Sequence, residues 1–168
     1  MLKIFKWSAI FVAAMFAAAQ FVRPAKTNPP VEEAKAVQAY LKVPPQVDAI
    51  FRRACYDCHS NETVWPWYSN LAPASWFLAG HVDHGRKHLN FSDWARAERR
   101  APNKNASAQV DDICKEVRGG GMPLDSYLIL HPEARLSDQD VKVICDWAES
   151  ERRRLAHESA RQALELDQ

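Results

Sequence analysis

Glycine and long β-branched runs are scarce in this sequence. Its 168 residues contain five glycines but ten prolines, and this composition favours short helices joined by ordered loops. An internal repeat and a low-complexity tract are both absent. The length is sufficient for one ordinary domain and too short for two.

An excess of charge of one sign is lacking as well. The formal net charge is +1 at pH 7, so the composition gives no indication of a nucleic-acid partner. Charged residues gather in residues 151–168, which we interpret as a solvated helical extension. The Arg152–Arg154 run within it is interpreted as a solvated face rather than a binding patch.

One long apolar run stands near the N-terminus, from Trp7 to Val22, directly after Lys3 and Lys6. It is either a secretory signal cleaved at the small residues Ala17–Ala19, which would release a soluble periplasmic protein, or an uncleaved membrane anchor. We favour the anchor because no strong cleavage context follows. Residues 1–25 then form the anchor, and the positive charges before it place the rest of the chain on the periplasmic side of the bacterial inner membrane.

The chemistry of the chain centres on the run Cys55-Tyr56-Asp57-Cys58-His59. A Cys-x-x-Cys-His run is typical of covalent haem c attachment. On a helix, the thiols of Cys55 and Cys58 point to one side, where each can form a thioether with a haem vinyl group. His59 lies on that side too and is the expected proximal iron ligand. The sequence therefore predicts one covalent haem c as cofactor.

Two other interpretations of the cysteine pair are weaker. Half of a zinc site would need a second Cys-x-x-Cys or His-x3-His pair at a suitable spacing from Cys58, and no pair follows at such a spacing. A thioredoxin-like redox pair would need a βαβ pattern around it, which the sequence also lacks.

Helical spacing of apolar residues predicts an all-α domain of the cytochrome c type around one haem. The haem domain is expected over residues 46–150, after a polar tether and a short helix in residues 26–45. A loop is expected from Met122 to Leu136. The expected helices are Val31–Leu41, a helix from about Gln46 that carries Cys55 and Cys58, Pro73 to about His88, Ser92–Arg100, a helix capped by Ser107, and one opened by Ser137–Asp140.

The iron needs a sixth ligand or an open site. Met122 is the single methionine beyond the N-terminal apolar run, and it follows three glycines and precedes Pro123. Proline restricts the residue before it to an extended conformation, which suits a strap across a haem face. Met122 is therefore the expected distal ligand. The competing ligands are four histidines, His81, His84, His88 and His131. The first three of these also form a stripe that could bind a separate metal.

An aromatic block follows the haem motif. Trp65, Trp67 and Tyr68 stand close together, and Trp76 comes after Pro73. The block is either a hydrophobic loop over the core or a lid on the haem, in which an indole N–H or the phenol contacts a propionate. These aromatic residues are candidate cofactor contacts.

The same segments carry a resemblance to a known family. The stretches Cys55–Asn61, Trp65–Ser69 and Leu89–Ser92 are similar to the haem-binding domain family of small bacterial monohaem c-type proteins, and the similarity covers nearly the whole chain. Separately, Gly121-Met122-Pro123 followed by Leu136-Ser137-Asp138 resembles the distal half of class I cytochromes c, in which the methionine is the axial ligand. The resemblance implies haem binding more firmly than any particular task.

Cys114 and Cys145 fall on the buried faces of consecutive expected helices, on either side of the Met122 loop. They are either two core thiols or a disulfide that pins these helices together in an oxidising compartment.

These features predict an electron carrier rather than an enzyme. With His59 and Met122 both on the iron there is no room for a substrate, so the haem would exchange single electrons with redox partner proteins. The alternative is a haem-based sensor or a peroxidase-like protein with an open or switchable sixth site, suggested by the surplus of histidines. A purely structural haem module that docks a membrane complex is a third interpretation.

Overall fold

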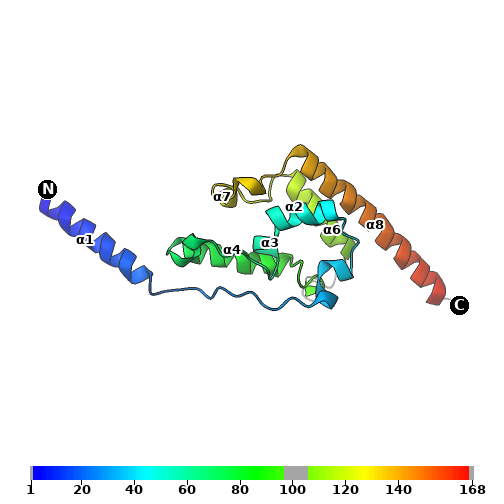
Figure 1. The fold of residues 1–168 in the computed structure, drawn as a ribbon, viewed down its shortest axis with the longest axis horizontal. Helices are drawn as coiled ribbons and strands as arrows, with labels where there is room; N and C mark the ends of the chain where they lie inside the picture. The colour runs from blue at the N-terminus through cyan, green and yellow to red at the C-terminus, as the bar shows by residue number, and fades with distance from the viewer. Residues whose placement is uncertain (1, 97–105, 167–168) are drawn as a thin grey trace.

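The structure is a computed structural model that describes residues 2–96 and 106–166. Within these ranges it contains seven α-helices and no strand (Figure 1), which confirms the predicted all-α class. The helices are α1 (Leu2–Ala19), α2 (Pro45–Ala54), α3 (Tyr56–His59), α4 (Ala74–His88), α6 (Ala106–Arg118), α7 (Asp125–Leu128) and α8 (Asp138–Leu166). The 3₁₀ turns are η1 (Glu33–Lys35), η2 (Val37–Ala39), η3 (Trp67–Asn70) and η4 (Pro132–Ala134).

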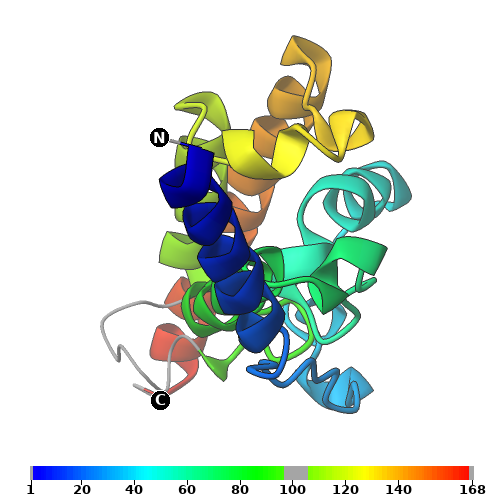
Figure 2. The ribbon, with the colours of Figure 1, turned by 90° about the vertical axis from the view of Figure 1, so that its left-hand side faces the viewer.

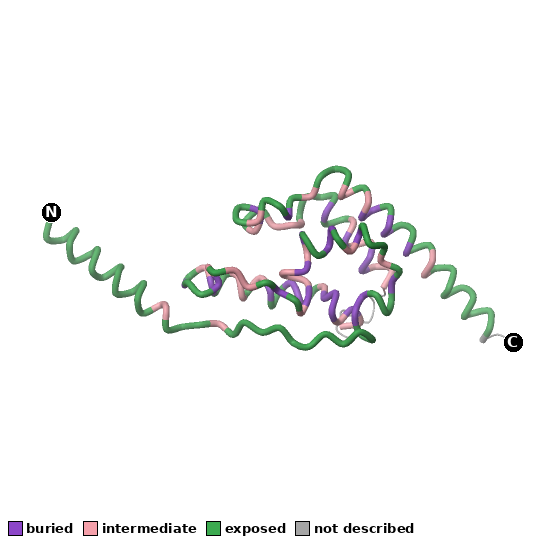
Figure 3. The backbone as a smooth tube through the Cα atoms, viewed as in Figure 1, coloured by how far each residue is buried: buried purple, intermediate pink, exposed green. Residues whose placement is uncertain are grey.

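Helix α1 stands apart from the rest of the chain and buries none of its residues (Figures 1 and 3). Its 18 residues are long and apolar enough to cross a membrane, a test that a signal sequence near the N-terminus also passes. A mostly exposed, extended segment, which we call the tether (residues 22–32), then runs along the domain to η1.

The segment Val31–Leu41 forms η1 and η2 rather than the single helix expected. Its backbone groups bond to a distant segment instead of completing a helical ladder. The Val37 N–H donates to the Phe91 carbonyl (2.8 Å), and the Trp94 N–H donates to the Lys35 carbonyl (2.8 Å). Backbone hydrogen bonds to residues 91–94 therefore prevent this segment from forming the single helix that its apolar spacing predicts.

Several helix boundaries also differ from expectation. The helix of the haem motif breaks at Cys55, whose φ of −124° ends α2 before α3 resumes. Ser107 lies inside α6 and is not its cap. The loop expected after Met122 contains α7 and η4. The expected helix Ser92–Arg100 lies partly outside the described residues.

The start of α8 follows the prediction closely. Ser137 Oγ accepts from the Asp140 N–H (3.1 Å), and the Asp140 carboxylate accepts from the Ser137 N–H (2.9 Å). This reciprocal pair is a capping box. The later part of α8 extends from the domain as a helix (Figure 1). Arg154 is an exception to the expected solvated face because it bonds the buried Glu151 carboxylate (2.6 Å).

The core is built around stacked aromatic rings beside the haem motif. Phe91 stacks on Phe51 and on Tyr56 with ring centroids 4.9 and 5.1 Å apart, and Trp147 meets Phe51 edge-on. Helices α6 and α8 close over this cluster and are joined by a Cys114–Cys145 disulfide, so the disulfide alternative is confirmed. The bridge encloses the segment that carries Met122.

Candidate haem site

A cavity of about 490 Å³ opens beside the Cys-x-x-Cys-His motif, a size in the range of small-molecule and cofactor sites. Cys55 and His59 line it from the motif, and Met122 lines it from the segment after α6. Its apolar wall comprises Leu89, Phe91, Ile113 and Val117. Its polar wall comprises His84, His88, Gln109, Asp112 and Glu116.

His59 is held in the tautomer that an iron ligand requires. Its Nδ1 lies 3.1 Å from the carbonyl oxygens of both Gly85 and Leu89. Because carbonyls only accept, Nδ1 carries the proton and the Nε2 lone pair is free. Burial lowers the pKa of His59, against the opposing effect of the two carbonyls, so the ring stays neutral at neutral pH.

The motif helix approaches α4 closely enough to require a glycine. A Cβ on Gly85 would lie 2.6 Å from the Cys58 carbonyl oxygen, far inside van der Waals contact. The same residue supplies one of the carbonyls that orient His59. Because Gly85 has no side chain, α3 and His59 can pack directly against α4.

Cys55 and Cys58 are free thiols. Burial raises the pKa of Cys55 to about 12 and that of Cys58 to about 11, so both stay protonated at neutral pH. Thioether formation with a haem vinyl group starts from thiols of this kind. Cys55 lines the cavity and Cys58 does not, and the backbone of Cys58 lies next to Gly85 of α4.

Met122 is positioned by the turn that ends α6. Gly120 has a φ of +71°, in the left-handed region that favours glycine. The Gly121 N–H then donates to the Glu116 carbonyl (2.9 Å), which folds the chain back toward α6 just before Met122. Met122 also lines a second hollow of about 590 Å³, but neither the haem-motif cysteines nor a histidine lines that one.

Gln109 shows that the cavity fits a polar-edged ligand such as haem. Its side chain is only 4% exposed, and neither amide atom has a hydrogen-bond partner among the described residues. A buried unpaired amide costs about 1–3 kcal/mol, so such a group calls for a partner. Gln109 lines the cavity, where haem carboxylates could supply one.

Comparison with known proteins agrees with this geometry. A family model described as a haem-binding domain matches residues 14–150, which is most of the chain. The chain belongs to the haem-binding domain family. No curated protein and no solved structure matches it. Haem binding therefore rests on the family as well as on the cavity.

The histidines of this haem-binding domain divide into two groups. His84 and His88 line the cavity with their Nε2 atoms 3.3 Å apart. His81 instead packs on Phe77, and His131 bonds the Tyr68 hydroxyl (2.8 Å) outside the cavity lining. Among the described residues, no group of three or more His, Cys, Asp or Glu side chains could hold a metal ion.

The predicted aromatic contacts lie outside the cavity lining. The Trp65 indole N–H donates to the Asn28 side chain (3.3 Å), and the Trp76 indole N–H donates to the Val22 carbonyl (2.6 Å). Trp67 is 77% exposed. In this structure the aromatic block holds the tether and faces solvent, while Phe91 contacts the cavity.

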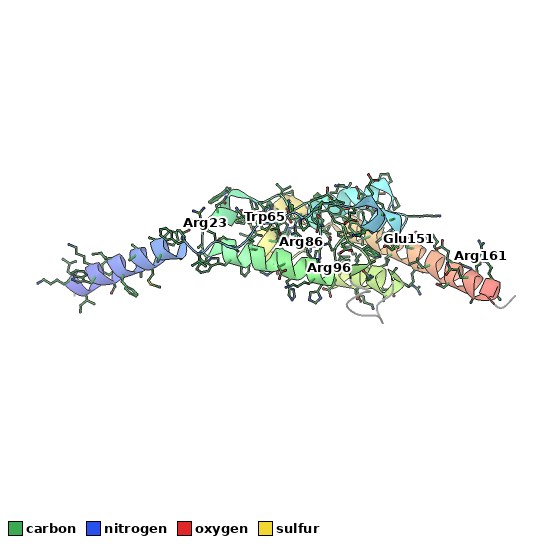
Figure 4. All side chains as sticks on the ribbon, turned by 90° about the horizontal axis from the view of Figure 1, so that it is seen from below. Arg23, Trp65, Arg86, Arg96, Glu151 and Arg161 are labelled. Atoms are coloured by element: carbon green, nitrogen blue, oxygen red, sulfur yellow. A yellow bond between two sulfur atoms is a disulfide. The ribbon has the colours of Figure 1, made fainter. Side chains whose placement is uncertain are left out.

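Arg86 is a structural residue that the sequence analysis did not identify. It is buried and donates to the Ser60 and Thr27 carbonyls and to the side chains of Asn28 and Thr63. It thereby ties the chain after the haem motif to the tether (Figure 4). Arg86 follows Leu78 and Val82 at helical spacing, so the sequence places its charge on the apolar face of α4. A charge at such a position indicates a buried side chain with hydrogen-bond partners.

A hydrogen bond links the methionine segment to the haem motif. The Tyr127 hydroxyl on α7 donates to Asp57 Oδ2 (2.7 Å), and Asp57 stands between the two motif cysteines. Asp57 Oδ1 accepts from the Val64 N–H (2.9 Å). Burial, followed by the bond to Asp57, raises the pKa of Tyr127, so its hydroxyl stays protonated and remains a donor.

Tyr127→Phe should loosen the Met122 side of the haem site without removing any ligand. We expect the unfolding free energy of the haem-loaded protein to fall by roughly 1.5–3 kcal/mol, the range for a hydrogen bond to a charged group. Urea denaturation measures the change. Tyr40→Phe, at a ring that is 38% exposed, is the control. Equal effects of the two variants would show that the Asp57 bond does not stabilise the site.

Proposed function

We propose that this haem-binding domain holds one covalent haem c and transfers single electrons outside the cytoplasm. The observation that carries the proposal is that Cys55, His59 and Met122 line one cavity. A thiol, an imidazole with a free Nε2 and a thioether are groups that would attach a haem and supply its iron with two protein ligands.

The haem, when bound, supplies iron that alternates between ferric and ferrous forms. The chain does the rest. Cys55 and Cys58 would hold the macrocycle covalently, and the Gly85 and Leu89 carbonyls keep the Nε2 atom of His59 available as an iron ligand. Met122 offers a soft, neutral sulfur that favours the ferrous form and raises the reduction potential relative to two histidines. The apolar wall of the cavity would shield the haem from water on that side.

We further propose that α1 anchors the protein at the periplasmic face of the inner membrane. Lys3 and Lys6 lie at the start of α1, before its uncharged run from Trp7, as expected for a cytoplasmic N-terminus. The Cys114–Cys145 disulfide supports an oxidising compartment for the domain. The redox partners would be one-electron carriers on that side.

A sensor or peroxidase-like function is the second candidate, and one observation favours it. His84 and His88 bring two imidazoles to the same cavity as Met122. Either could replace the methionine on the iron or exchange protons with a ligand bound at an open sixth site.

Absorption spectra of the haem-loaded protein separate the two functions. For the carrier we expect low-spin spectra in both oxidation states, with no change when carbon monoxide is added to the ferrous protein or peroxide to the ferric protein. Rapid binding of either ligand would instead support the open-site function and overturn the simple carrier.

A further inference from the structure

Large apolar side chains remain exposed at one end of the domain. Trp67 is 77% exposed, Phe77 60% and Ile129 78%. Monomeric soluble proteins rarely leave a cluster of this kind in water unless the surface binds something. We call this surface the aromatic end, and it comprises Trp67, Leu71, Trp76, Phe77, Ile129 and Leu130.

The members of the aromatic end come from η3, from α4, which packs against η3, and from the residues that follow α7. Trp67 belongs to η3, Trp76 and Phe77 to the first turn of α4, and Ile129 follows α7 directly. The bond between the Tyr68 hydroxyl and His131 Nε2 (2.8 Å) joins the η3 side to the α7 side. In Figure 1, α7 and the start of α4 lie at the end of the domain nearest α1, and Figure 2 views that end.

The end of the anchor helix is bonded to this same surface. The Gln20 side chain accepts from the Ala72 N–H (2.9 Å) and donates to the Ala72 carbonyl (3.3 Å). The Trp76 indole N–H donates to the Val22 carbonyl (2.6 Å). The point at which the chain would leave a bilayer is therefore fixed on the aromatic end.

Positive charges flank the junction. Arg23 donates to the Gln20 carbonyl (3.2 Å), and Lys26 bonds the side chains of Ser69 and Asn70 on η3. Both cations thus stand where α1 meets the domain, as Figure 4 shows for Arg23. Basic residues beside a membrane helix are attracted to anionic lipid headgroups.

We propose that the aromatic end lies in the interfacial layer of the bilayer that holds α1, so that the domain has a fixed orientation on the membrane. The inference rests on the proposed anchoring by α1. Tryptophan favours this layer because its ring is apolar and its N–H is polar. The aliphatic side chains of the aromatic end would be removed from water in this layer. The occupant is a lipid surface rather than a protein because the anchor ends on this surface.

The orientation would set the haem cavity at a distance from the lipid. His84 lies ten residues after the first residue of α4, which corresponds to about 15 Å at the helical rise of about 1.5 Å per residue. The cavity would therefore be accessible to partner proteins in the aqueous layer, whereas the aromatic end would be covered by lipid.

Spin labels can test the orientation in the full-length, haem-loaded protein. A cysteine is introduced at the aromatic end by Phe77→Cys or Ile129→Cys, and at the far part of α8 by Ser159→Cys as control; the three positions are exposed. The unsubstituted chain serves as a labelling blank, because its own cysteines are expected to be occupied by haem or paired. The proteins are placed in vesicles of phosphatidylcholine and phosphatidylglycerol and recovered by flotation.

We expect the labels at residues 77 and 129 to collide several-fold more with oxygen, which concentrates in lipid, than with a water-soluble nickel chelate. The label at residue 159 should show the reverse preference. A chain that floats while all three labels prefer the nickel chelate would overturn the docking and leave the anchor intact. A chain that does not float would overturn the anchoring and the docking with it.

Discussion

Removal of both motif thiols, in a Cys55→Ala/Cys58→Ala variant, should convert a covalently bound haem into an extractable one. Each thiol contributes one thioether, so the parent should keep its haem on the polypeptide in acid–acetone and the double variant should release it. His59 would remain able to bind the iron, so the variant can still fold around haem. The measurement is the partition of haem absorbance between the precipitated protein and the organic phase.

The Cys114→Ala/Cys145→Ala variant is a matched control because it removes the same number of cysteines. These residues form the disulfide between α6 and α8 and do not belong to the motif. This variant should retain its haem in acid–acetone, although its stability should fall by about 2–4 kcal/mol, the usual effect of losing a disulfide. Haem in the organic phase from the matured parent would show that the cofactor is not covalent.

The buried face of a helix could be predicted from the sequence where its apolar residues follow a single helical spacing. Val110, Ile113 and Val117 are buried along α6, as their spacing predicts. Gln109 falls on this apolar face, four residues before Ile113, and is buried in the cavity. A polar residue at an apolar position of the helix was the available signal that Gln109 lines a cavity.

Residue type alone does not tell which aromatic residues form the core. Phe91 and Trp94 are buried, whereas Trp67 is exposed, although all three are large aromatic residues outside the α-helices. The difference comes from backbone bonds between distant segments, such as that from the Phe91 N–H to the His59 carbonyl (2.7 Å). Pairings of this kind leave no periodic pattern in the sequence.

Met122→Ala should leave the haem attached while opening the iron. The thioether is soft and neutral and favours ferrous iron, so its loss should lower the reduction potential by on the order of 100 mV, within the roughly 0.8 V that axial ligands control. The weak red charge-transfer band of sulfur-ligated ferric haem should disappear. The ferrous protein should then bind carbon monoxide, which the parent should not. Spectra and a redox titration measure these changes.

The cavity identifies the histidines that could contradict this assignment. His84 and His88 line it together with Met122, whereas His81 and His131 do not, so His84→Ala and His88→Ala are the necessary companions. Both should keep the red band and exclude carbon monoxide. Met122→His should restore a low-spin spectrum at a lower potential than the parent, because imidazole favours ferrous iron less than sulfur does. If Met122→Ala stays low-spin while His84→Ala or His88→Ala becomes high-spin, a histidine is the sixth ligand and the carrier is a bis-histidine cytochrome.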